Sequence, residues 1–180
     1  VSYPNDQRVI TPSLVYPMGK TALNISDNGV ALIAIALQTS TDETTIAAVT
    51  AQQELLLTYL IQEESFLGDE VTLERNQVVI EGITPSVKRI LLSKEQRDLY
   101  LAHDNGQVSH YDLSDKEEPK LIQRVSVVEN SDTISDIRFL TGDISLLIGD
   151  SQGHVTQWFL VRNERGDRTL TPIRHFDAGN

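Results

Sequence analysis

Four histidines, His103, His110, His154 and His175, are the residues of this sequence best suited to bind a metal or transfer a proton. A zinc site needs its ligands at short strand or helix spacing, with a carboxylate companion. His103 falls at the end of an expected strand, His110 within one and His154 at a turn, and His110 is replaced by Gln157 in the repeat described below. This pattern favours ordinary polar surface positions, so we expect no metal site and no other cofactor.

Two short motifs match ligand sites only in part. Gly19-Lys20-Thr21 is similar to the end of a phosphate-binding P-loop, but Leu14 stands where that motif needs its first glycine. Asp104-Asn105-Gly106 lacks the alternating acids and closing glutamate of a calcium loop, so a hairpin turn is the better interpretation. The sequence also has no Gly-x-Ser-x-Gly elbow and no acids paired for catalysis. We therefore predict that the protein is not an enzyme.

The charge of the chain argues against nucleic acid as a partner. The 180 residues contain 26 acids and 15 bases, a net charge of -11, whereas phosphate neutralisation needs clustered lysine and arginine. Residues 42–81 hold nine acids against Arg75 alone. This acidic stretch is expected to be a solvated face, with a docking surface for a basic partner as the alternative.

Composition favours a folded domain rather than a membrane span. Hydrophobic residues make up 39% and charged residues 23% of the chain, and cysteine is absent, which excludes disulfides and thiolate sites. The longest apolar run, Val30 to Leu37, has eight residues, against the ~20 that a transmembrane helix requires. Because the chain opens on Val1 without a leader pattern, we expect residues 1–180 to be a single-domain fragment.

An internal repeat then indicates which elements position these residues. The stretch Val87 to Leu113 aligns without a gap on Ile134 to Leu160, 47 positions later. Each copy predicts two strands joined by a polar turn, then a tight turn, a third strand that reaches an aromatic residue, and an outermost fourth strand at about Lys120–Val128 or Thr169–Phe176. The repeat assigns structural roles to the turn and aromatic positions Asp104, Asn105, Gly106, Tyr111, Gln152, Gly153 and Trp158.

Four short antiparallel strands on a repeat near 45 residues are typical of a β-propeller blade. Gly106 to Asp112 resembles the third strand of WD40 repeats, but Phe159 stands where the second copy would need its aspartate, and neither copy has a preceding Gly-His pair. The fold class is therefore predicted to be all-β, a partial β-propeller built of WD40-like four-stranded antiparallel blades, without the hydrogen-bonded tetrad of true WD40 repeats.

The first part of the chain fits the repeat less well. Leu14 to Gly29 matches it with one gap, and residues 45–50 and 54–62 suggest strands, although 55–61 is also compatible with a short helix. Val71–Leu73 and Val78–Ile80 suggest a further pair of strands. We predict blades at about 1–50, 83–128 and 130–177, separated by an irregular acidic segment at about 51–82.

Three segments also resemble the large extramembrane insertion of the long-form phosphate ABC transporter permease of some Gram-negative bacteria. They are Val15 to Leu23, Asp104 to Leu113 and Leu146 to Glu164. The resemblance implies a periplasmic domain of an inner-membrane permease that receives phosphate from a binding protein. It assigns no phosphate-coordinating role to any residue here.

Two functions from different classes follow. The first is a non-catalytic interaction module, on the periplasmic side of the bacterial inner membrane, that contacts the phosphate-binding protein or the remainder of the permease. The alternative is a sensing domain that binds a small solute or ion in a propeller channel.

Blade number adds an expectation about association. Propellers close with ~4–8 blades, so three blades leave two blade faces without neighbours. We therefore expect the chain to be part of a longer propeller whose remaining blades lie in the parent sequence, and the isolated chain either to self-associate through its terminal blades or to be only marginally stable.

Overall fold

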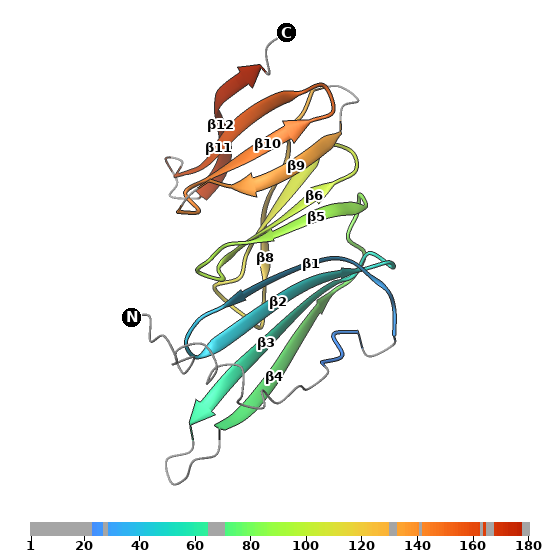
Figure 1. Ribbon diagram of the computed structural model, residues 1–180, viewed down its shortest axis with the longest axis vertical. Coiled ribbons are helices and arrows are strands. Elements are labelled where there is room, and N and C mark those ends of the chain that lie inside the picture. Colours follow the sequence, from blue (N-terminus) through green and yellow to red (C-terminus); the bar gives the residue numbers. More distant parts are fainter. Residues whose placement is uncertain are drawn as a thin grey trace, which may run out of the picture.

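The described residues of the protein form three four-stranded antiparallel sheets, stacked one on the next along the long axis of the molecule (Figure 1). A computed structural model describes residues 23–26, 29–64, 71–129, 133–140, 142–162, 164 and 168–177. None of these residues is helical, so the prediction of an all-β fold of four-stranded antiparallel blades is confirmed. Within the same residues, no helix is long and apolar enough to cross a membrane.

Each sheet follows the chain in simple order, so that every strand pairs with the next one in sequence. We call the sheets the first, second and third blade. The first comprises β1 (Leu32–Thr39), β2 (Glu43–Thr50), β3 (Leu55–Glu64) and β4 (Val71–Ile80); the second β5 (Val87–Leu92), β6 (Asp98–His103), β7 (Gln107–Asp112) and β8 (Lys120–Ser126); the third β9 (Ile134–Phe139), β10 (Ser145–Asp150), β11 (His154–Arg162) and β12 (Arg168–Asp177).

The 47-residue repeat coincides with the second and third blades. Strands β5, β6 and β7 begin 47 positions before β9, β10 and β11. The pairing register repeats as well, since Leu99 pairs with Tyr111 as Leu146 pairs with Trp158. The outermost strands β8 and β12 lie where the sequence placed them.

The first blade corrects two predictions. Residues 51–82 are not irregular, because they contain β3 and the continuous strand β4, and the first sheet spans residues 32–80 rather than 1–50. Residues 55–61 belong to a strand, so the helical alternative is wrong. Residues 23–26, part of the expected early repeat, form no strand, and the rest of that copy before residue 23 lies outside the described residues.

One turn residue explains why the bounds predicted for the first blade were wrong. The hairpins β6–β7 and β10–β11 turn at Gly106 and Gly153, which have φ of 78° and 89°. In the first blade the same turn is made by Gln53, with φ of 60°, and its N–H donates to the Thr50 carbonyl over 2.9 Å. A search for turn glycines misses this hairpin, since glycine is the usual residue at positive φ.

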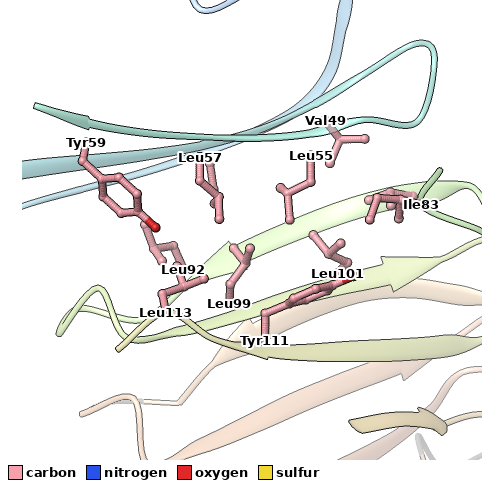
Figure 2. Packing of buried hydrophobic residues seen from close by; sticks show 12 residues of the cluster. Val49, Leu55, Leu57, Tyr59, Ile83, Leu92, Leu99, Leu101, Tyr111 and Leu113 are labelled. Carbon is pink, nitrogen blue, oxygen red and sulfur yellow. The ribbon is translucent and has the colours of Figure 1, made fainter. Parts of the chain in front are cut away.

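The core lies between the sheets, because the second and third blades each bury one face on the blade before them. We call the corresponding face of any blade its leading face, and the opposite one its trailing face. Figure 2 shows Leu55 and Leu57 on the trailing face of the first blade pointing toward Leu99 and Leu101 on the leading face of the second. All four side chains are completely buried. The sheets are therefore joined by apolar packing rather than by a shared strand.

The second joint repeats this arrangement one blade later. Leu146, Ile148 and Trp158 on the leading face of the third blade pack against Tyr100 and Val108 on the trailing face of the second. Every residue of β6 is consequently buried, because the second blade has a neighbour on both faces.

Candidate functional site

The predicted turn positions all lie in the hairpins that precede the third strand of a blade. Asp104, Asn105 and Gly106 connect β6 to β7, and Asn105 Oδ1 accepts a hydrogen bond from the Gln107 N–H over 3.2 Å. Gln152 and Gly153 occupy the same turn between β10 and β11. Here Asp150 Oδ1 accepts the Gln152 N–H over 2.8 Å. The Asn105 and Asp150 side chains thus stabilise their own turns.

The two repeated aromatic residues lie in different joints. Tyr111 is buried against the first blade, and burial raises the pKa of its hydroxyl. Trp158 is buried against the second blade, and its indole N–H donates to Thr156 Oγ1, in its own strand, over 2.8 Å. Both rings act as packing residues at blade joints.

Two of the four histidines depart from the expected surface positions. His103 and His110 are 1% and 2% exposed, because β6 and β7 lie in the blade that is covered on both faces. His154 and His175 are exposed. No group of three histidine, aspartate or glutamate side chains in the described part of the chain is arranged to hold a metal ion.

His103 is held as a neutral imidazole in a chain of hydrogen bonds. Its Nδ1 lies 2.7 Å from the Pro85 carbonyl, which can only accept, so Nδ1 carries the proton. Its Nε2 then accepts from Ser109 Oγ over 2.7 Å, and Ser109 Oγ accepts from Arg124 Nε over 3.1 Å. Burial lowers the pKa of His103, which agrees with the neutral form. The chain connects β6, β7, β8 and the segment before β5.

A charged cluster joins the second and third blades. Asp98 on β6 accepts from His110 Nε2 over 2.8 Å and from Arg168 Nη2, on β12 of the next blade, over 3.2 Å. Burial alone would raise the pKa of Asp98, but the hydrogen bond from His110 and the charge of Arg168 hold it below its ordinary value. Tyr100 stacks on the His110 ring with centroids 4.8 Å apart. We call these four residues the Asp98 cluster.

This cluster was not predicted from the sequence, although the repeat contains a signal for it. Asp98 and His110 correspond, 47 positions later, to Ser145 and Gln157. Gln157 Nε2 donates to Ser145 Oγ over 3.0 Å, so the same cross-strand hydrogen bond is made by neutral groups in the third blade. Two polar pairs at identical repeat positions were visible in the sequence, whereas the contact to Arg168 depends on how the blades stack.

Further polar contacts fix the blades against one another. Gln123 on β8 makes two hydrogen bonds to the backbone of Leu170 on β12, of 2.7 and 3.3 Å. Gln38 on β1 donates to the Leu92 carbonyl over 3.2 Å, and Lys116 forms an ion pair with Glu43. These bonds set the lateral position of each sheet, which apolar packing alone does not fix.

Two clefts lie beside the joint between the second and third blades. The larger, of about 460 Å³, is lined by residues that include Val127, Asp150, His154, Trp158 and His175. A smaller one of about 280 Å³ is bordered by three arginines, Arg97, Arg162 and Arg168, and by the acids Asp98 and Asp112. Neither cleft contains a nucleophile hydrogen-bonded to a base of the kind that covalent catalysis requires.

Comparison with known proteins identifies the fold. No protein-family model and no curated protein matches the sequence. Among solved structures, the chain is similar to the β-propeller domain of Myceliophteria thermophila Cps50 (Swd1), with 12% identity and a TM-score of 0.50 over 73% of this chain and 41% of that one. It is also similar to Saccharomyces cerevisiae Sqt1, with 15% identity and a TM-score of 0.51 over 82% of this chain and 35% of that one.

The chain therefore spans less than half the length of these two structures. At 12% and 15% identity, the likeness establishes the fold and carries no activity or partner over to this chain. The fold is that of a WD40-like β-propeller.

Proposed function

We propose that this chain is a non-catalytic interaction module, and specifically an extramembrane part of a phosphate ABC transporter permease, on the periplasmic side of the bacterial inner membrane. The observation that carries the first part is the architecture, in which titratable groups such as His103, His110 and Asp98 are used to hold strands and blades together. The transporter assignment rests on the sequence resemblance alone.

The first blade offers a surface for a basic partner. Asp42, in the β1–β2 turn, and Glu74, on β4, are both exposed. They lie at the same end of the sheet, since Glu43 and Glu74 both pair with Ile61. An acidic edge on a chain of net charge -11 attracts a basic protein surface and repels free phosphate.

Isothermal titration of the chain against the cognate phosphate-binding protein, and separately against inorganic phosphate, tests this proposal. We expect saturable heat with the binding protein, weakened by added salt and by the charge reversals Asp42→Lys and Glu74→Lys. The reversal Glu81→Lys, at an exposed acid just after β4 and at the opposite end of that strand from Glu74, is the control and should have little effect.

Saturable binding of phosphate without the protein would contradict the proposal and favour the solute-sensing alternative. The larger cleft between the second and third blades is where a small ligand would then be sought. No binding of either probe would contradict both functions.

A further inference from the structure

The smaller cleft beside the joint of the second and third blades combines positive charge with hydrogen-bond donors. Its volume is about 280 Å³, and its lining includes Arg97, which precedes β6, Arg162 on β11 and Arg168 on β12. The three guanidinium groups thus come from two blades and border one concave space. Each guanidinium carries several N–H donors in a fixed plane and no acceptor. The cleft therefore offers donors that carry positive charge to a ligand.

The protein itself uses few of these donors. Arg168 makes one hydrogen bond to the described residues, from Nη2 to Asp98 Oδ2 over 3.2 Å. Arg97 Nε lies 3.9 Å from Asp112 Oδ1, which is beyond hydrogen-bond length. The Arg162 side chain forms no hydrogen bond or ion pair with any residue that the structure describes. Most donors of the three guanidinium groups are therefore available to a ligand.

The strand register gives a second, independent reason to expect an anion at this place. Arg162 and Arg168 are direct cross-strand partners in the β11–β12 pair. Like charges directly opposite each other on neighbouring strands destabilise a sheet. Asp98 offsets the charge of Arg168, but no acid among the described residues forms an ion pair with Arg162. An anion bound by both arginines would remove this repulsion.

The two acids that line the cleft are already engaged. Asp98 has a donor at each of its oxygens. Asp112 accepts from the backbone N–H and from the hydroxyl of Ser114. Burial alone would raise the pKa of Asp112, but these bonds and the charge of Arg97 hold it below its ordinary value. With both acids ionised and His110 counted as neutral, the three arginines leave the lining with a net charge of +1.

One wall of the cleft is apolar, and the cleft is formed by elements that hold each other in place. Ile122 on β8 borders it and is 39% exposed. Gln123, the next residue, makes two hydrogen bonds to the backbone of Leu170, so β8 and β12 are tied together beside the cleft. A site that is formed before binding loses little conformational entropy when a ligand enters. These features suit a ligand with one negative charge and a short apolar part.

We propose that this cleft binds the carboxylate of a small organic acid, with Arg162 as its main anchor and Ile122 against its apolar part. Arginine and carboxylate form parallel, charge-assisted hydrogen bonds. A lining of net charge +1 matches a monoanion, whereas phosphate carries more than one negative charge at neutral pH and is repelled by a chain of net charge -11. This inference does not depend on the proposed transporter role.

An NMR titration of the isotope-labelled chain tests the proposal, with N-acetyl-leucine as the probe. N-acetyl-leucinamide has the same apolar part without the charge and is the matched control ligand. We expect saturable shifts of the Nε–H signals of Arg97, Arg162 and Arg168 with the acid and no such shifts with the amide. The absence of saturable shifts with the acid, or equal shifts with the amide, would overturn the proposal.

Two matched variants locate the site. Arg162→Gln removes the main anchor, and it should weaken binding of N-acetyl-leucine at least about tenfold with an unchanged circular dichroism spectrum. Arg174→Gln removes the same charge from an exposed residue of β12 outside the cleft, so it should bind the acid as wild type does. Unchanged affinity in Arg162→Gln, or an equal loss in Arg174→Gln, would contradict a site at this cleft.

Two further probes identify the source of the carboxylate. Inorganic phosphate should bind more weakly than N-acetyl-leucine, and tighter binding of phosphate would overturn the assignment to a carboxylate. A longer peptide that ends in leucine with a free C-terminus should bind no more tightly than N-acetyl-leucine, because the proposed site ends at the cleft. Tighter binding of the peptide would assign the carboxylate to a polypeptide and overturn a small acid as its source.

Discussion

Asp98 connects the second blade to the third through its ion pair with Arg168, and it is more buried than the exposed Arg89–Asp136 pair that also joins these blades. The substitution Asp98→Asn keeps its shape but removes the negative charge that holds His110 and Arg168. Because these partners are largely buried, we expect a loss of about 1–3 kcal/mol in the free energy of unfolding. Urea denaturation measures it. Asp136→Asn, which removes exposed ion pairs to Arg89 and Arg138, is the control and should cost at most about 1 kcal/mol.

The same carboxylate predicts a pH dependence of stability. The pKa of Asp98 in the folded protein is lower than its ordinary value, so the ionised form stabilises the fold at neutral pH. This contribution is lost as the pH falls through the folded-state pKa, below about 4. Wild type and Asp98→Asn should therefore differ in stability at pH 7 and converge in acid. A difference that grew on acidification would contradict this assignment.

Tyr59 carries a buried hydroxyl that we expect to lower stability. Its Oη is buried without a hydrogen-bond partner among the described residues, and burial, with the nearby Glu43 and Asp115, raises its pKa to about 12. Tyr59→Phe removes a desolvated polar atom and keeps the ring that Lys116 approaches at 5.6 Å. We expect the variant to be up to about 1 kcal/mol more stable in thermal unfolding. A large loss would show that the hydroxyl has a partner.

At the scale of the elements, the β2–β3 turn shows why the first blade departs from the repeat. Gln53 adopts the positive φ that glycine takes in the other blades, and its side chain also makes a hydrogen bond that glycine could not make. Its Oε1 accepts the Val87 N–H over 2.9 Å, and its backbone carbonyl accepts the Ile83 N–H over the same distance. The residue thus ties the turn of the first blade to the start of the second.

Gln53→Gly tests that explanation. Glycine relieves about 1–2 kcal/mol of backbone strain. It also costs about 0.5–1 kcal/mol of chain entropy, and it leaves the buried Val87 N–H unpaired at about 1–3 kcal/mol. The balance is a net loss of about 1 kcal/mol in urea denaturation. Gln96→Gly is the matched control, since Gln96 has φ of 58° and a buried Oε1 with no partner in the described structure. It should be neutral or stabilising.

These elements also show what the sequence could and could not predict. Periodicity located β5 to β12 because two copies share their turn glycines and apolar positions at a constant spacing of 47. The first blade has glutamine at the turn, so no local signal aligned it. Burial of His103 and His110 was missed for a different reason. It depends on the second blade having neighbours on both faces, and a strand sequence does not record what lies above and below it.

At the scale of the whole molecule, the protection of a strand from solvent depends on where its blade lies in the stack of described blades. Strand β6 is paired on both edges and buried on both faces, whereas β1 pairs only with β2 among the described strands and carries the exposed residues Ile35 and Leu37. Local opening is least costly where few contacts must break.

Hydrogen exchange followed by mass spectrometry should therefore show the slowest amides in β6 and β7 and much faster ones in β1 and β12 of a dilute sample. Equal protection of β1 and β6 in the dilute sample would mean that the leading face of the first blade is already covered. The first blade would then not be an open end of the stack.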